Sequence, residues 1–109
     1  MYEVFFKALG EPTRLGIIRL LAQEELCVCE LEELLKISQP RISQHLRVLK
    51  QARLLTERKE GTKKYCQLDH ENYQNTMISF MEYMKTPLTE FEYKELSAVR
   101  EATRMDENG

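Results

Sequence analysis

Two short stretches with helical apolar spacing, separated by a break of three residues, restrict the fold of this chain more than any other feature. Ser38 is a candidate N-cap after the break, and Pro40 falls in the first turn that would follow it. The apolar positions are Val28, Leu31, Leu34 and Leu35 in the first stretch and Ile42, Leu46 and Leu49 in the second. Two short helices joined by a tight turn form a helix-turn-helix, which we predict over residues 28–52.

The period of the sequence changes after this motif. Two strand-like runs, 54–58 and 64–68, flank a short polar segment that contains Gly61, and this pattern predicts a hairpin with a glycine turn. A helix-turn-helix followed by such a hairpin, the wing, is a winged helix-turn-helix, in which the second helix enters the major groove of DNA. We therefore expect a wing over residues 54–68.

Helical spacing predicts further helices over residues 2–9, about 12–23, 70–85 and 89–104. The expected fold class is mainly α with a small β-hairpin and about six helices, in a single domain over residues 1–104 with a frayed tail at 105–109. Helices 2–9 and 70–85 carry more apolar surface than this core needs, so we expect them to join a symmetric homodimer. The expected interface residues are Val4, Phe5, Leu9, Tyr73, Met77, Phe80, Met81 and Met84.

Charge is distributed unevenly along the chain. Residues 36–64 contain nine basic and two acidic side chains, so this segment carries +7 and the remainder −9, for a total of −2. A basic patch on an acidic body is expected of a surface that neutralises phosphates, although a solvated face without a partner would have the same charge. The consecutive order of helix-turn-helix, polar helix face and basic hairpin favours double-stranded DNA as the partner.

Other classes of protein fit the sequence poorly. No apolar run approaches the roughly 18 residues of a membrane span, and the amino terminus lacks the pattern of a secretory signal, so we expect a cytoplasmic protein without a membrane partner. Two histidines, no glycine-rich phosphate loop and no nucleophile signature argue against an enzyme and against a catalytic cofactor.

The three cysteines suggest a soft-ion site. Cys27 and Cys29 lie where the first helix of the motif begins, and at such a junction both sulfurs can turn toward one ion. The chain before the motif should pair with the second wing strand, which would bring Cys66 close and make it a candidate third ligand. Its alternative role is that of a small buried hydrophobic residue.

Three segments together resemble regulators of the ArsR/SmtB family. They are FKALGEPTRL at residues 6–15, ELCVCEL at 25–31 and SQPRISQHL at 38–46. The resemblance implies a dimeric repressor that binds operator DNA and releases it when an inducer binds. The DNA contacts then fall on Gln39, Arg41, Ser43, Gln44, His45 and Arg47 of the second helix and on Arg58, Lys59, Lys63 and Lys64 of the wing.

The same resemblance bears on the inducer. Arsenic-responsive members carry this Cys-Val-Cys pair, but the third cysteine of some arsenic sensors is replaced here by Glu32. We expect arsenite or antimonite to bind Cys27 and Cys29, with Cys66 as a candidate third ligand. Cadmium or lead sensing stays open, as does a thiol-redox or persulfide sensor in which Cys66 bonds to Cys27 or Cys29 on oxidation.

Overall fold

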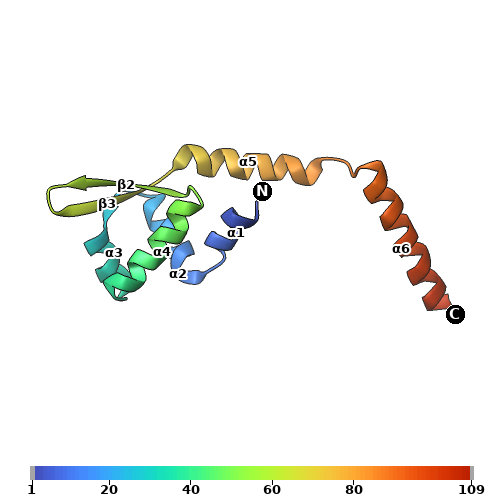
Figure 1. Cartoon of the computed structure of the whole chain (residues 1–109), viewed down its shortest axis with the longest axis horizontal. Helices are drawn as coiled ribbons and strands as arrows, with labels where there is room; N and C mark the ends of the chain where they lie inside the picture. Colours follow the sequence, from blue (N-terminus) through green and yellow to red (C-terminus); the bar gives the residue numbers. More distant parts are fainter. Residues whose placement is uncertain (1, 109) are drawn as a thin grey trace.

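The computed structural model describes residues 2–108 and contains a winged helix-turn-helix with two further helices after it (Figure 1). The helices are α1 (Glu3–Leu9), α2 (Pro12–Leu21), α3 (Val28–Leu35), α4 (Gln39–Gln51), α5 (His70–Lys85) and α6 (Glu90–Asn108). The strands are β1 (Leu26–Cys27), β2 (Leu55–Glu60) and β3 (Lys63–Leu68), which form an antiparallel sheet in the order β1-β3-β2. The expected fold class, apart from the dimer, is confirmed.

The helix-turn-helix is held together by apolar side chains on the facing sides of α3 and α4. Leu31 of α3 and Ile42, Leu46 and Leu49 of α4 are all buried in one core. Lys36 ends α3 with a left-handed backbone conformation, at φ 55°, and its N–H bonds to the carbonyl of Glu32. This sharp end lets the chain reverse within three residues and begin α4.

The wing is anchored to the same core at its base. In β3, Cys66 and Leu68 point inward and are buried, and Leu55 of β2 is buried opposite Leu68. Gly61 occupies the hairpin turn with a positive φ of 63°, a conformation that glycine adopts without steric cost. The tip of the hairpin extends away from the helices, as Figure 1 shows.

The second half of α5 and all of α6 leave the globular body (Figure 1). Asp69 is the N-cap of α5, and its carboxylate accepts a hydrogen bond from the N–H of Asn72. Tyr73 and Met77 of α5 pack against the core. Tyr2 still contacts Phe80 and Tyr83 of α5, and beyond this point the helix projects outward. The molecule measures 69 × 28 × 20 Å. The chain was expected to fray from residue 105, but α6 continues to Asn108; the last residue of that expected tail, Gly109, lies outside the described residues.

The residues expected at a dimer interface have different environments. Phe5 was placed there wrongly, because it is 4% exposed and lies in the core of its own protomer. Leu9, Tyr73 and Met77 are partly buried against that core. Phe80 stacks edge-to-face on Phe6, with ring centroids 4.6 Å apart. Large exposed apolar side chains are left at Val4, Met81 and Met84.

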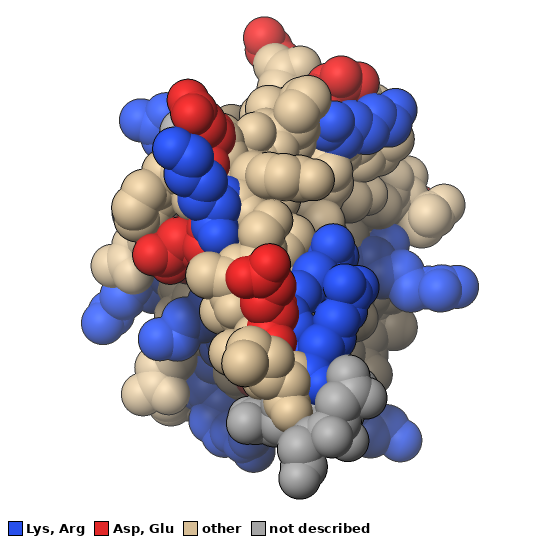
Figure 2. Space-filling model, turned by 90° about the vertical axis from the view of Figure 1, so that its right-hand side faces the viewer, with Lys and Arg blue, Asp and Glu red and all other residues tan. Residues whose placement is uncertain are grey.

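The α6 end of the molecule has a mixed surface. Figure 2 shows charged side chains of both signs there, separated by uncharged ones. Among residues 2–108, no helix is both long enough and apolar enough to cross a membrane. The basic segment, residues 36–64, lies elsewhere, on α4 and the wing.

Candidate functional site

The exposed face of α4 displays the polar residues that were expected to read DNA. Gln39, Arg41, Ser43, Gln44 and Arg47 are all exposed on this helix. Such side chains donate and accept hydrogen bonds with the groove edges of bases or with phosphates. The burial of Ile42, Leu46 and Leu49 on the opposite side fixes the orientation of this face.

His45 does not belong to that face. Its side chain is 16% exposed, and its Nδ1 atom lies 3.7 Å from a carboxylate oxygen of Glu11 and 3.4 Å from a guanidinium nitrogen of Arg14. His45 therefore packs against the start of α2, and its expected contact with DNA stays a prediction.

The basic side chains of the wing fall into two groups. Lys59 and Lys63 are exposed and form no ion pair within the described part of the chain. Lys64 pairs with Glu57 at 3.3 Å, and Glu57 also pairs with Lys50 of α4 at 3.2 Å. Because Glu57 bridges the wing and α4, it positions the basic surface that was expected to contact DNA.

Arg58 is engaged within the protein. Its guanidinium bonds to Glu25 and Glu60 and lies 4.6 Å from the ring centroid of Tyr65. The bond to Glu25, and then that to Glu60, raise the pKa of Arg58 above its ordinary value. Arg58 is therefore placed to brace β2 against the chain before β1, and it would have to leave these partners to bind a phosphate.

The cysteine pair lies at the junction of β1 and α3. Cys27 is the N-cap of α3: its Sγ accepts a hydrogen bond from the N–H of Glu30 at 3.3 Å, and the Glu30 carboxylate accepts one from the N–H of Cys27 at 2.8 Å. This capping box holds the Cys27 backbone outside the helix. Cys27 and Cys29 are joined by a disulfide, so their sulfurs do turn toward each other at this junction.

Cys66 is not part of this arrangement. The expected pairing of β1 with β3 is present, but its register places Leu26 beside Cys66 and Cys27 beside Tyr65. Because neighbouring residues of a strand point to opposite faces, Cys66 points into the core and Cys27 to the other face of the sheet. Burial raises the pKa of the Cys66 thiol to about 11, and the negative charge of Glu57 adds to this effect. The oxidised pair that the redox alternative envisaged, between Cys66 and another cysteine, is thus replaced by Cys27–Cys29.

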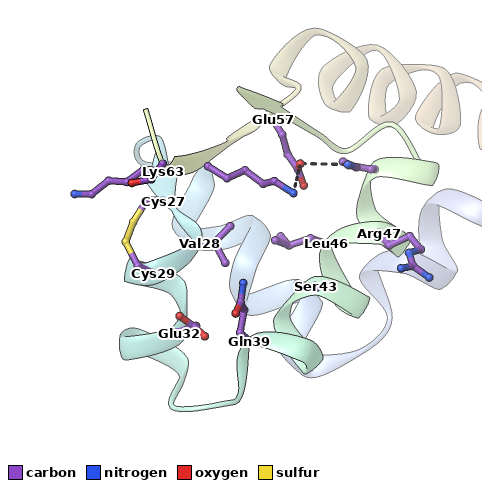
Figure 3. Close-up of a pocket in the computed structure, with 13 residues that line it drawn as sticks. Cys27, Val28, Cys29, Glu32, Gln39, Ser43, Leu46, Arg47, Glu57 and Lys63 are labelled. Atoms are coloured by element: carbon purple, nitrogen blue, oxygen red, sulfur yellow. Dashed lines mark ion pairs between the residues drawn. A yellow bond between two sulfur atoms is a disulfide. The ribbon is translucent and has the colours of Figure 1, made fainter. Parts of the chain in front are cut away.

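A cleft of about 390 Å³ connects the cysteine pair with the expected DNA face (Figure 3). Its walls come from the start of α3, the exposed side of α4 and the wing. The lining residues are Cys27, Val28, Cys29, Glu32, Gln39, Ser43, Leu46, Arg47, Lys50, Glu57, Thr62, Lys63 and Lys64. Four of them are basic and two acidic, so the cleft is positively charged overall.

The side chains that line the cleft provide some, but not all, of the ligands that a soft ion prefers. Two adjacent sulfurs are the ligands that trivalent arsenic and antimony prefer, whereas the carboxylate of Glu32 is a hard ligand. Within residues 2–108, no group of three or more histidine, cysteine or acidic side chains is placed to hold a metal ion. The pair therefore supplies two ligands, and this protomer does not add a third thiolate.

Sequence reasoning missed two residues that shape this site. Glu57 joins the wing to α4, and Glu30 completes the cap around Cys27. Glu57 had a signal in the sequence, since it is one of two acidic residues in the basic segment 36–64. Glu30 also had one, because it follows the N-cap position by three residues, the spacing of a capping box.

Comparison with protein families identifies the helix-turn-helix region. Residues 11–57 match the model of the family described as "Bacterial regulatory protein, arsR family". The chain is 46% identical over 69 residues to the arsenical resistance operon repressor of Staphylococcus xylosus, a match that covers 63% of this chain and 66% of the relative. It is 41% identical over 71 residues to the arsenical resistance operon repressor of Bacillus subtilis (strain 168), covering 64% of this chain and 68% of the relative.

Solved structures give the same result. A possible transcriptional regulator for arsenical resistance superposes with a TM-score of 0.64 at 33% identity, over 84% of this chain and 91% of the other. The chain spans between about half and two thirds of the length of the first curated relatives that it matches.

The different environments of the thiols lead to a labelling prediction. After reduction, iodoacetamide at pH 8 should modify Cys29, which is exposed, and leave Cys66 unmodified. With a pKa of about 11, Cys66 would be thiolate in roughly one molecule in a thousand at that pH, and its side chain is 0% exposed. Peptide mass spectrometry would measure the modification, with urea-unfolded protein as the control in which all three cysteines react. Equal labelling of Cys66 and Cys29 in the folded protein would contradict the burial of Cys66.

Proposed function

The chain belongs to the ArsR family of bacterial regulatory proteins, and from this premise we propose that it is a homodimeric repressor whose inducer is arsenite or antimonite. The family consists of transcriptional regulators and not of enzymes. We propose that Cys27 and Cys29 bind the inducer and that the exposed face of α4 binds double-stranded operator DNA. The observation that carries the proposal is the single cleft in which the cysteine pair, α4 and the wing meet.

DNA binding is supported by the shape and charge of the exposed surface. An α-helix fits the major groove, and α4 presents its polar side chains on the side away from the core. Gln44 has the two-point geometry that reads an adenine edge, and Arg41 suits a guanine or a phosphate. Lys59 and Lys63, which are exposed on the wing, suit phosphates only.

A dimer is supported by apolar surface that one protomer leaves uncovered. Val4 is 61%, Met81 53% and Met84 66% exposed, and Leu9 and Phe80 are only partly buried. A two-fold dimer would cover this surface and present two α4 helices to two half-sites.

Release is supported by the position of the cysteine pair on α3. A soft trivalent ion would draw both sulfurs into one pyramidal coordination sphere. For the sulfurs to serve as ligands, a thiol reductant must first reduce the Cys27–Cys29 disulfide to two thiols. Cys27 must then give up its bond from the Glu30 N–H, and the first turn of α3 must adjust. Since α3 packs through Leu31 against α4, this adjustment tilts α4. Couplings of this kind are typically about 1 to 3 kcal/mol, or five- to 150-fold in DNA affinity.

A second candidate function is thiol-redox sensing, which the Cys27–Cys29 disulfide favours. Oxidation would then change the start of α3 without an ion. A panel of arsenite, antimonite, cadmium, lead and peroxide, added to operator-bound protein, separates these inducers.

The DNA face can be tested with two substitutions of different kind. Gln44→Ala should reduce discrimination between operator and unrelated duplex by about 1 to 3 kcal/mol, because it removes a base contact. Lys63→Ala should weaken binding to every duplex alike and lower the salt slope by about one, because it removes a phosphate contact. Fluorescence anisotropy at several salt concentrations measures both, with Lys94→Ala on α6 as the control. Equal losses of operator discrimination would mean that α4 is not the recognition helix.

The dimer can be tested by sedimentation. Analytical ultracentrifugation at micromolar concentration should give a mass twice the 12.9 kDa of one chain. For the double variant Met81→Glu, Met84→Glu it should give the mass of a monomer. Burying two carboxylates in an apolar interface is costly, which is the reason for the shift. Leu34→Glu, at an exposed position of α3 away from α5 and α6, is the matched control and should remain dimeric. A monomeric parent protein would rule the dimer out.

The inducer site can be tested on the same DNA complex. Cys27→Ser and Cys29→Ser should each keep operator binding and abolish release by arsenite, because a hydroxyl is a poor ligand for a soft ion. Cys66→Ala should still release DNA, since Cys66 points to the opposite face of the sheet. If the double serine variant still releases DNA when arsenite is added, the inducer binds elsewhere.

A further inference from the structure

We propose that the third ligand of the ion held by Cys27 and Cys29 is the sulfur of a small anionic thiol bound in the cleft between α4 and the wing. The inference rests on the proposed function, since it completes the ligand set of that site. It concerns a co-ligand from solution, a compound that carries one thiol and at least one carboxylate.

The protomer leaves the third position open. Trivalent arsenic prefers three sulfur ligands, and this chain places two sulfurs at the cleft. Cys66 is fully buried on the other face of the sheet, and Glu32, the acidic residue of the cleft on α3, offers a hard oxygen. A sulfur from outside is therefore the ligand that fits the chemistry of the ion.

The cleft has room for such a molecule beside the sulfurs. Its volume of about 390 Å³ falls within the roughly 300 to 1,000 Å³ that is usual for small-ligand pockets. Cys29 is exposed, and Figure 3 shows the disulfide at one side of the cleft, with Gln39 and Leu46 across it on α4. A ligand from this side reaches Cys29 directly, whereas Cys27 is 2% exposed and becomes accessible when the first turn of α3 adjusts.

The charges of the cleft select an anion. Glu57 already neutralises part of the basic charge through its pairs with Lys50 and Lys64. Arg47 and Lys63 line the cleft with exposed side chains and have no ion pair within residues 2–108, so no carboxylate of this part of the chain neutralises them. An anionic thiol should therefore bind better than a neutral one, and a cationic thiol worst.

The reaction balances without a change in the oxidation state of arsenic. Two molecules of the external thiol first reduce the Cys27–Cys29 disulfide and become a disulfide themselves, with their two protons passing to the protein sulfurs. Arsenous acid, As(OH)₃, then reacts with the two protein thiols and one external thiol. Three As–S bonds form, three As–O bonds break, and the three thiol protons leave with the hydroxyls as three waters.

The bound thiol would also affect DNA. The cleft is lined by Gln39, Ser43 and Arg47, which belong to the proposed DNA face. Carboxylates held among these residues place negative charge next to the expected path of the phosphates. An anionic thiol should thus promote release beyond the effect of the ion alone.

The experiment uses the full chain, reduced with a phosphine and freed of reductant, and without DNA. Arsenite is added together with mercaptosuccinate, 2-mercaptoethanol or cysteamine, which carry negative, no and positive charge. Native mass spectrometry reads the stoichiometry, and the arsenic–thiolate absorption band reads the affinity. We expect one protein, one arsenic and one external thiol in the complex, with mercaptosuccinate the tightest and cysteamine the weakest.

Variants test the role of the cleft. Arg47→Gln and Lys63→Gln should each weaken capture of mercaptosuccinate about two- to fivefold, the range for exposed ion pairs, and bring its affinity closer to that of 2-mercaptoethanol. Lys94→Gln on α6 is the control and should change nothing.

Three results of these binding experiments would contradict the proposal or a part of it. A complex of protein and arsenic without external thiol, with an affinity that no monothiol alters, overturns this inference and leaves the proposed function standing. Equal capture of mercaptosuccinate and cysteamine overturns the choice of an anion. Failure of the reduced protein to bind arsenite under any of these conditions overturns the proposed metalloid site and this inference with it.

Discussion

Two residue pairs, Leu26 with Cys66 and Cys27 with Tyr65, join the short strand β1 to β3 and determine how the rest of the site is arranged. This pairing holds the start of α3 against the wing, so that helix-turn-helix and hairpin form one body. It also assigns side chains to faces: Leu26 and Cys66 enter the core, and Cys27 faces the cleft. The capping box at Cys27 and Glu30 then starts α3 at the point where the strand ends.

The consequence is that the cysteine pair and the proposed DNA face share a wall. Val28 and Cys29 belong to the first turn of α3, while Ser43 and Arg47 lie on α4 across the same cleft. Leu31 and Ile42, both 0% exposed, connect the two helices beneath it. Because protein cores are close-packed, a change in the first turn of α3 is expected to pass to α4 through these buried side chains. In the proposed mechanism, binding of the inducer at the sulfurs would therefore be linked to binding of DNA through these buried contacts between α3 and α4.

The sequence predicted the elements well because each has a clear period. The helix over residues 70–85 and the pairing of the chain near Cys27 with the second wing strand are both found in the structure. The role given to Cys66 failed for a specific reason: periodicity shows that two strands pair, but a shift of register by one residue reverses every side chain.

His45 and Phe5 show that helical periodicity does not reveal which distant element a side chain packs against. A polar residue at the edge of a helical face can turn toward a neighbouring helix, as His45 does toward Glu11. An apolar residue on a terminal helix can fill its own core, as Phe5 does. In both cases the packing partner lies far away in sequence, and a single sequence does not identify it.

The protomer is more extended than a compact domain of its length. Its radius of gyration is 20.4 Å, whereas a compact domain of about 100 residues has one of about 13 Å. The excess comes from α5 and α6, which extend beyond the body in Figure 1. Helices in water are stabilised mainly by packing of an apolar face, and here Phe91 and Val99 of α6 are 70% and 63% exposed. The cap of α6, in which the Glu92 N–H donates to the Thr89 hydroxyl, contributes too little to replace that packing. The stability of these helices therefore depends on apolar surface from outside the protomer, and in the proposed dimer the second copy supplies it.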